Sequence, residues 1–533
     1  MLLANRCSWI ALALLSVSAA SQAQPAPRQL PRTGFAFVLL GEGTDGNPVP
    51  MVRTVEEGAA ACPELKPNSG GTLAAMTPRR RPETGDFSGV LVCEARYPAD
   101  ENASVSVGGR RIDLPKVRLD TPRRVLLIGD TGCRGDTQNK PQPCDGGGYD
   151  KIWPFGTLAD GEVLPPPDLI LHAGDYNYRG TPEHFVIPAR ATGYREDLKV
   201  TVFDTGDLDD EDDPQVTIGA TYWSQNIEGS PVPDGWAAWR DDFFVPAAGL
   251  LPVAPWVFSR GNHELCSRAG PGWFYLLDPA SSLLGPGRQQ DACPPQTPAG
   301  WRPGAWPRPP ARPFFREPFP TNPTPPHRVR LGGLSIIAVD SSNAADAVPY
   351  NTDLYIEQYR AVADMLADGT PSWILTHRPI WGVVKKSKGG PALDDAPYGF
   401  INVAQQNAVA AVFWSGPPEN VKVVLSGHMH RFQAVGFAGR RPPQLVVGNG
   451  GMELSDVFPK PSAEDPKRPV LVPDLAGVRA SVVGLRDFGT MILTPGDAGA
   501  WTSVLVDPTG KKLATCDSRW PRLGDGRSVC ALE

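Results

Sequence analysis

Long apolar runs, paired-cysteine motifs and an excess of positive charge are all missing from this sequence of 533 residues. Beyond the start of the chain, no segment offers the roughly 18 uncharged apolar residues that a membrane-crossing helix needs, so we expect a mature chain without a transmembrane segment. No Cys-x-x-Cys pair occurs, which disfavours a metal site built from thiolates. The net charge of −7 gives no indication of a nucleic-acid-binding surface.

Histidine is scarce, which makes its positions informative. The chain contains only seven histidines. Four of the seven fall in short polar segments that follow apolar runs: His263, His377, His428 and His430. Imidazole is a common ligand of zinc, iron and manganese, so this grouping favours a metal site.

Five short apolar runs are each followed by residues that bind metal ions. The runs cover residues 125–128, 169–171, 256–258, 373–375 and 421–425, are too short for helices and predict buried strands. The segments that follow are Gly129-Asp130-Thr131-Gly132, Gly174-Asp175-Tyr176-Asn177-Tyr178, Gly261-Asn262-His263-Glu264, Thr376-His377-Arg378-Pro379 and Gly427-His428-Met429-His430. In four of them a glycine lets the backbone come close to an ion. Because open α/β sheets bind ligands at the carboxyl ends of their strands, we expect these segments to converge.

These segments resemble the calcineurin-like metallophosphoesterase family and, within it, the purple acid phosphatases. The usual first block of the family is Asp-x-His, but here it reads Asp130-Thr131-Gly132, so one histidine ligand is missing. Tyr178, in the spacing Asp175-x-x-Tyr178, takes its place, as in the purple acid phosphatases. The resemblance spans residues 122–455 and implies an α/β fold, a four-layer αββα sandwich.

The resemblance also implies two metal ions. One ion would be bound by Asp130, Asp175, Tyr178 and His430, and the other by Asn262, His377, His428 and again Asp175, which would bridge the two. A phenolate and carboxylates suit Fe3+, whereas imidazoles suit a divalent Zn2+, Fe2+ or Mn2+. The catalytic residue would be His263, which would hold a phosphate oxygen or protonate the leaving alkoxide.

Each of these residues also has a simpler interpretation. An aspartate after a strand often caps a helix or a turn, which is the alternative for Asp130. His172 is expected to be a core residue, with support of a ligand through a hydrogen bond as the alternative. His184 and His327 are expected at the surface.

The predicted function is hydrolysis of small-molecule phosphate esters by a secreted dinuclear-metal enzyme, most simply an acid phosphatase of the purple type. A phosphodiesterase or nucleotide hydrolase is the enzymatic alternative, because selectivity resides in the loops. A secreted metal-binding protein without catalysis is a third possibility. The plant-like enzymes carry further histidines soon after the His377 segment, but here Lys385, Lys386 and Lys388 occur, which either face solvent or supply positive charge to the phosphate.

The start of the chain predicts export. Arg6 precedes an apolar stretch at residues 9–17, and small residues then end in Ser21-Gln22-Ala23, which predicts a signal peptide over residues 1–23. The protein would be secreted or periplasmic, and no cysteine follows the cleavage point to carry a lipid. The eight remaining cysteines suit an oxidising compartment. Their clustering favours four pairs: Cys62–Cys93, Cys133–Cys144, Cys266–Cys293 and Cys516–Cys530.

Three regions would follow the signal peptide. Residues 24–121 show short strands without helical periodicity and predict an N-terminal β-sandwich domain, which resembles in position the fibronectin-like domain of larger purple acid phosphatases. Residues 122–455 would form the metallophosphoesterase domain, with helices at 352–366 and 403–414. Residues 456–533 would form a C-terminal β extension, with strands at 489–493, 501–506 and 512–515 that complete the second sheet.

Two insertions interrupt the predicted catalytic domain. The first holds an acidic run from Asp204 to Asp213, which predicts a solvated loop, with calcium binding as the alternative. The second, residues 294–326, is rich in proline and arginine and predicts a rigid surface loop, although its arginines could meet phosphate. The oligomeric state is left open.

Overall fold

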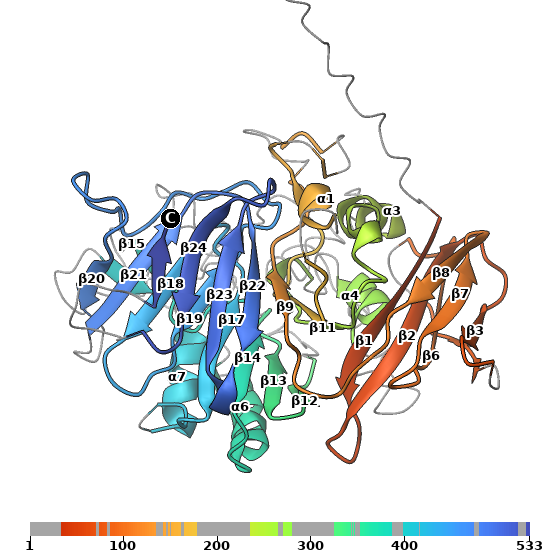
Figure 1. Ribbon diagram of the computed structural model, residues 1–533, viewed down its shortest axis with the longest axis horizontal. Coiled ribbons are helices and arrows are strands. Elements are labelled where there is room, and N and C mark those ends of the chain that lie inside the picture. The colour runs from red at the N-terminus through yellow and green to blue at the C-terminus, as the bar shows by residue number, and fades with distance from the viewer. Residues whose placement is uncertain are drawn as a thin grey trace, which may run out of the picture. The chain divides into compact units, whose positions relative to one another are not determined.

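The computed structural model describes most of the chain after residue 32 (Figure 1). The described residues are 33–70, 74–82, 86–134, 142–144, 148–149, 151–160, 165–178, 235–264, 270–279, 324–342, 344, 346, 352–385, 398–414, 416–473, 479–520 and 529–533. Several predictions concern residues outside these ranges: the signal peptide, the acidic run at 204–213, the arginines of the second insertion, His184, Lys386, Lys388 and the Cys266–Cys293 pair. No helix among the described residues has both the length and the apolar character to cross a bilayer.

The N-terminal region is a β-sandwich, as expected. One layer contains β1 (Gly34–Glu42), β2 (Pro48–Glu57), β5 (Thr77–Pro78) and β6 (Val90–Arg96), and the other contains β3 (Glu64–Pro67), β4 (Ala74–Ala75), β7 (Ala103–Val107) and β8 (Arg110–Leu114). Val52 of β2 and Val105 of β7 are buried in the same apolar core. The sandwich is joined to the next region through its first strand, because β1 pairs in parallel with β11 (Trp256–Phe258) at Leu39. The exact domain boundaries stay a prediction.

The first sheet has eleven strands and holds the first three predicted ligand strands. These are β9 (Val125–Ile128), β10 (Leu169–His172) and β11, which are fully buried and pair in parallel. The strand order is β25-β24-β23-β22-β9-β10-β11-β1-β2-β6-β5. The chain therefore brings segments from both of its ends to the two sides of the ligand strands (Figure 1).

The second sheet has eight strands in the order β12-β13-β14-β17-β19-β18-β21-β20. Their bounds are β12 (His327–Leu331), β13 (Leu334–Val339), β14 (Ser372–Thr376), β17 (Val421–Ser426), β18 (Phe432–Phe437), β19 (Gln444–Val447), β20 (Val470–Pro473) and β21 (Arg479–Leu485). The central strands β13, β14, β17 and β19 pair in parallel, so the carboxyl ends of β14 and β17 lie at one edge.

Alternation along the strands of the second sheet divides its side chains between two cores. Trp373 and Val423 pack in the same core as Leu127 and Leu171 of the first sheet. Ile374 belongs to a second core, which includes buried residues of helices α6 (Thr352–Leu366) and α7 (Val403–Val412). Two sheets packed face to face with helices outside confirm the predicted αββα sandwich.

The C-terminal strands correct one expectation. The strands predicted to complete the second sheet are β22 (Thr490–Pro495), β23 (Trp501–Val506) and β24 (Lys512–Asp517), and together with β25 (Cys530–Leu532) they extend the first sheet instead. The reason is that β22 pairs antiparallel with β9, where Met491 and Leu493 enter the core between the sheets. The strands β20 and β21 complete the second sheet.

Short elements complete the described fold. They are α1 (Phe155–Leu158), α3 (Trp236–Trp239), η2 (Arg240–Phe244), η3 (Pro246–Gly249), η4 (Asn262–Glu264), α4 (Gly270–Leu276), η5 (Asp497–Gly499) and a hairpin of β15 (Val383–Lys385) with β16 (Tyr398–Phe400). Three predicted disulfides are present: Cys62–Cys93, Cys133–Cys144 and Cys516–Cys530. Cys133 follows the Asp130 loop closely, so its disulfide braces a loop of the predicted site.

Candidate metal centre

Loops from both sheets supply the predicted site residues. Asp130 follows β9, Asp175 comes soon after β10, and Asn262 begins η4 shortly after β11. In the second sheet, His377 follows β14 and His428 comes soon after β17. The site therefore lies where the carboxyl ends of the central strands of both sheets meet, as the sequence predicts.

The backbone at these loops is strained. Among the described residues, seven other than glycine have a positive φ, and four of the seven are predicted ligands: Asp130 (54°), Asp175 (58°), His428 (76°) and His430 (43°). Residues with a side chain rarely adopt this conformation, and such residues cluster at functional sites. A Cβ atom added at Gly261 would lie 2.1 Å from Asp175 Oδ1, so the close approach of the loops requires glycine there.

The first set of donor atoms surrounds the Tyr178 hydroxyl. This oxygen lies 2.8 Å from Asp175 Oδ2, 3.1 Å from Asp130 Oδ1 and 3.0 Å from His430 Nε2. The pair Asp130 Oδ1 and His430 Nε2 is 3.6 Å apart. Four donors from three loops thus converge on one point, and they are the four residues predicted for the first ion.

The second set surrounds the side-chain oxygen of Asn262. This oxygen lies 2.8 Å from His377 Nε2 and 3.0 Å from His428 Nδ1. His377 Nε2 is also 3.2 Å from Asp175 Oδ2. These are the four residues predicted for the second ion, and the two histidines present different ring nitrogens to it.

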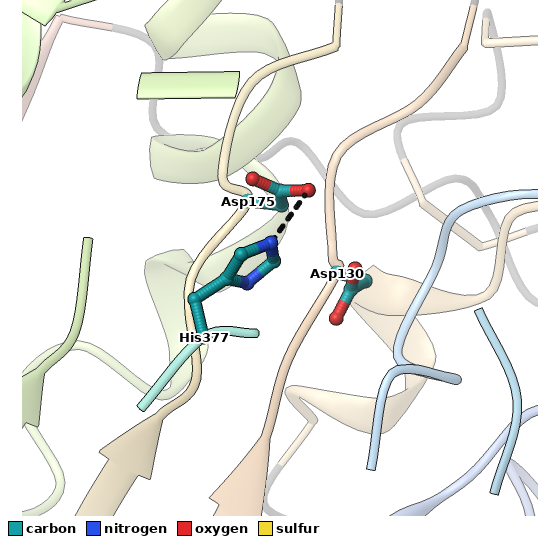
Figure 2. Close-up of side chains that lie close together, drawn as sticks. All are labelled: Asp130, Asp175 and His377. Carbon is teal, nitrogen blue, oxygen red and sulfur yellow. Dashed lines mark ion pairs between the residues drawn. The ribbon is translucent and has the colours of Figure 1, made fainter. Parts of the chain in front are cut away.

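Asp175 belongs to both sets through a single atom. Its Oδ2 contacts both the Tyr178 hydroxyl and His377 Nε2, while its Oδ1 accepts a hydrogen bond from the backbone N–H of His263 at 2.9 Å. Figure 2 shows the side chains of Asp175, His377 and Asp130 close together, with the ion pair between Asp175 and His377 drawn as a dashed line. The ligand atoms of these three residues all lie within 4.8 Å of one another. This position suits a bridging carboxylate.

The electrostatics of the cluster favour cations. Burial, together with repulsion from Asp175, raises the pKa of Asp130 to about 8. Burial and the same two carboxylates raise the pKa of the Tyr178 hydroxyl well above its ordinary value. Burial alone would lower the pKa of His377, but the Asp175 carboxylate outweighs it and raises this pKa to about 9. The chain thus buries anionic donors that need positive charge to ionise together.

The donor sets fit a pair of metal ions. Metal–ligand bonds of about 2.0–2.2 Å would bring neighbouring ligand atoms to roughly 3–3.5 Å from each other, close to the spacing of 2.8–3.6 Å in both sets. The first set offers a phenol and carboxylates, which are hard donors, and the second offers two imidazoles and an amide oxygen. The Asn262 Nδ2 atom has no hydrogen-bond partner in the described part of the chain, so its amide is oriented by what its oxygen contacts.

Glu264 and Asp242 hold the ligand loops, although the sequence alone did not single them out. The Glu264 carboxylate accepts hydrogen bonds from the backbone N–H groups of Asp175, Tyr176 and Asn177 at 2.8–3.3 Å. It also accepts one from the Gly261 N–H at 3.0 Å, so it ties the loop of Asp175 to its own loop. Asp242 of η2 accepts a hydrogen bond from the Tyr178 N–H at 2.8 Å. For Glu264, the only signal in the sequence is its position directly after the Gly-Asn-His motif.

Asp346, which is not itself a predicted ligand, contacts the predicted ligand His428. Its Oδ2 lies 2.9 Å from His428 Nε2 and 2.5 Å from Arg378 Nη1. Arg378 follows His377 directly and is buried. Although burial acts to raise it, the charge of Arg378 and the contact with His428 lower the pKa of Asp346 below its ordinary value. No spacing in the sequence connects Asp346 with His428.

His263 lies next to two of the predicted ligands, because its backbone N–H donates to Asp175 and its ring packs against Tyr178. Its ring centroid is 4.0 Å from that of Tyr178. It is 7% exposed, whereas the seven predicted ligands are 0–2% exposed. His263 therefore lies toward the more accessible side of the site.

The other described histidines are buried. His172 Nδ1 accepts a hydrogen bond from the Gly174 N–H, and its Nε2 lies 2.9 Å from Thr131 Oγ1. His172 thereby connects the loops of Asp130 and Asp175, in line with the expected core position. The expectation that His327 lies at the surface is wrong, because alternation along β12 turns His327, with Val329 and Leu331, inward.

Comparison with known proteins identifies the family of this chain. A model of the calcineurin-like phosphoesterase family matches residues 123–432. The sequence has no match among curated proteins. Among solved structures, a purple acid phosphatase from yellow lupin (Lupinus luteus) seeds is similar with a TM-score of 0.46 and 14% identity, over 91% of this chain and 74% of that one. Because the family model matches more than half of the length of this chain, the chain belongs to the calcineurin-like phosphoesterase family.

Proposed function

We propose that this metal-dependent phosphoester hydrolase is an acid phosphatase of the purple type, exported from the cytoplasm, which hydrolyses small phosphate monoesters. The observation that carries the proposal is the place of the Tyr178 hydroxyl, within 3.1 Å of Asp130, Asp175 and His430. The missing histidine of the first family block leaves room for this phenol. Both departures occur in the same donor set, which favours the purple type over other members of the family.

The two donor sets differ in charge, which favours two different ions. Asp130, Asp175 and the Tyr178 phenolate would hold Fe3+ with His430, because hard anionic donors suit a trivalent ion. Asn262, His377 and His428 would hold Zn2+, Fe2+ or Mn2+ together with Asp175. When bound, such a pair supplies an activated water and stabilises the in-line displacement at phosphorus.

His263 would act on the substrate. Its backbone N–H donates a hydrogen bond to Asp175 Oδ1, and its ring lies against Tyr178, so the imidazole is held beside the two donor sets. At mildly acidic pH an imidazole can donate a hydrogen bond to a phosphate oxygen or a proton to the leaving alkoxide. Its greater exposure supports this role.

Export is supported by the three disulfides, because such bonds persist in oxidising compartments. The predicted signal peptide supports the same proposal. The protein would be secreted or periplasmic.

Turnover of two substrates tests the proposed activity. Purified protein, loaded with iron and zinc, should hydrolyse p-nitrophenyl phosphate much faster than bis(p-nitrophenyl) phosphate, with higher activity at mildly acidic than at alkaline pH. Preference for the diester would support the phosphodiesterase alternative. No turnover of either ester, with both ions bound, would leave a metal-binding protein without this activity.

A further inference from the structure

The two histidines predicted for the second ion are held by different kinds of partner. His377 presents Nε2 to Asn262, and its Nδ1 lies 2.8 Å from the backbone carbonyl oxygen of Ala173. His428 presents Nδ1 to Asn262, and its Nε2 lies 2.9 Å from the carboxylate of Asp346. The ring of His377 therefore contacts a neutral carbonyl group, whereas the ring of His428 contacts an ion pair, with the Asp346 carboxylate at 2.9 Å and the Arg378 guanidinium at 3.2 Å.

The contact with Asp346 determines which nitrogen of His428 is free. The nearer group, the Asp346 carboxylate at 2.9 Å, can only accept a hydrogen bond, so it favours the neutral tautomer whose proton lies on Nε2. The Arg378 guanidinium, 3.2 Å from the same nitrogen, has its closer contact with Asp346 Oδ2 and donates there. Nδ1 then has its lone pair directed at the Asn262 oxygen and the second donor set. A carboxylate behind an imidazole also makes the opposite nitrogen a stronger donor to a metal ion.

Asp346 is itself firmly placed. Its backbone carbonyl oxygen accepts hydrogen bonds from the N–H groups of Asn402 and Val403, at the start of α7. Its Oδ2 accepts a hydrogen bond from Arg378, whose backbone N–H in turn donates to Ser341 Oγ at 2.8 Å. Arg378 balances the charge of Asp346, so the carboxylate stays ionised in a buried position.

We propose that Asp346 is a positioning residue that orients His428 for the second metal ion and strengthens its Nδ1 as a donor. This role rests on the proposed metal centre, and it concerns only the second ion. The first donor set has no contact with Asp346 in the described structure, so the two ions should respond differently when Asp346 is changed.

The test is the affinity of each ion in the variant Asp346→Asn. The protein is stripped of metal, loaded with Fe3+, and titrated with Zn2+ against a competing chelator. We expect Zn2+ to bind about 10–100-fold more weakly than in the unchanged protein, the usual effect of losing such a partner. The iron content and the visible band from the Tyr178 phenolate should stay the same.

A neighbouring aspartate provides a matched control. Asp340 is also buried, lies six residues earlier and pairs with Arg260 at 3.3 Å. Its carboxylate accepts described hydrogen bonds from Arg260, Thr324 and Ser342, and none of these is a predicted ligand. Asp340→Asn should lower stability without weakening Zn2+ binding. Asp346→Glu, which keeps the charge but moves it, should bind Zn2+ with intermediate affinity, and it replaces Asp346→Asn if that variant does not fold.

The possible outcomes separate this role from the metal centre itself. Unchanged Zn2+ affinity in Asp346→Asn, with two ions bound to the unchanged protein, overturns the role of Asp346 and leaves the proposed function intact. An equal loss of Zn2+ affinity in Asp340→Asn also overturns it, because any buried aspartate would then matter equally. If the unchanged protein binds fewer than two ions, the metal centre fails and this role fails with it.

Discussion

The metal centre and a cluster in the N-terminal sandwich both bury several charged groups, but the two differ in the cations that neutralise their carboxylates. In the sandwich, Arg53 and Arg79 are buried side chains that share the Glu94 carboxylate. Arg53 also donates to the backbone oxygens of Leu276 and Asp278, and Arg79 donates to those of Phe274 and Tyr275. The protein therefore supplies both the counter-charge and most of the hydrogen-bond acceptors of this cluster, and among the described residues only Arg53 Nε lacks a partner.

The metal centre lacks such balance. The Tyr178 hydroxyl lies within 3.1 Å of carboxylate oxygens of both Asp130 and Asp175. Among the described ion pairs, these carboxylates contact no lysine or arginine, only His377 and His430, which are themselves predicted ligands. Burying a carboxylate without a lysine or arginine beside it costs roughly several kcal/mol. A buried cluster neutralised by arginines needs no further partner, whereas one whose only described cations are its own histidines offers donor atoms that suit ions from outside.

The arginine cluster still bears on the metal centre indirectly. The four carbonyl groups that it binds belong to the end of α4 and the residues just beyond it. α4 follows η4, the turn that holds Asn262. The sandwich therefore fixes the helix that leads away from a ligand turn, which supports a packing role over an independent docking role.

Removing the bridging carboxylate should have the largest effect. We expect Asp175→Ala to lose hydrolysis to background and to bind less than one full pair of metal ions per chain, because Asp175 Oδ2 belongs to both donor sets. Elemental analysis and turnover of p-nitrophenyl phosphate measure both effects. Retained activity with two bound ions would refute the bridging position.

The next effect concerns His263. We expect His263→Ala to keep both ions and to lower turnover by about 10²–10⁴-fold, the range for a lost general acid. The ring contributes no donor atom to either set described here, so metal content is the control. Loss of an ion in this variant would instead make His263 a ligand.

The variant Tyr178→Phe tests whether the Tyr178 phenolate causes the expected visible absorption. A phenolate bound to Fe3+ gives a broad visible absorption band, which neither Zn2+ nor Mn2+ can produce, so the variant should lose that band. It should also retain iron less well, because a hard donor is gone while Asp130, Asp175 and His430 remain. An unchanged spectrum in Tyr178→Phe would show that another group causes the colour.

The smallest effect on hydrolysis is expected from the arginine cluster. Glu94→Gln should lower the free energy of unfolding by about 3–5 kcal/mol, because it leaves Arg53 and Arg79 buried without their anion. Denaturant unfolding of the metal-loaded protein measures this change. A loss of metal ions as large as that in Asp175→Ala would show that the two clusters are not distinct.

The same variant has a predicted pH dependence. Burial acts to raise the pKa of Glu94, but Arg53 and Arg79 outweigh it and lower this pKa below the ordinary 4.5. A carboxyl whose pKa is lower in the folded protein stabilises it above the unfolded pKa, and this stabilisation is lost as the pH falls through the folded pKa. The stability difference between the unchanged protein and Glu94→Gln should therefore be constant near neutral pH and shrink below about pH 4.5. A difference that grows at low pH would contradict the pairing.

The sequence predicted the site better than its surroundings. Short apolar runs before metal-binding residues were sufficient to predict the strands β9, β10, β11, β14 and β17, and the structure brings all seven predicted ligands together. Strand ends are local features with a known position in a parallel sheet, which is why this worked. That these residues bind metal ions stays a prediction.

Features that depend on long-range hydrogen bonds were missed. Asp346 lies 82 residues from His428 and contacts it only because α7 and the end of β14 bring the two together. The prediction that β22 joins the second sheet was wrong for a similar reason, since alternation of apolar residues predicts a strand but not the strand with which it pairs. A single sequence offers no signal for either pairing.

Elemental analysis of the purified, unchanged protein tests most directly whether the two donor sets hold two different ions. We expect two metal ions per chain, one of them iron and the other a divalent ion, and a violet colour in the oxidised protein. A fully active, colourless protein without iron would contradict the purple-type centre. A protein with one ion or none after loading would contradict the two donor sets themselves.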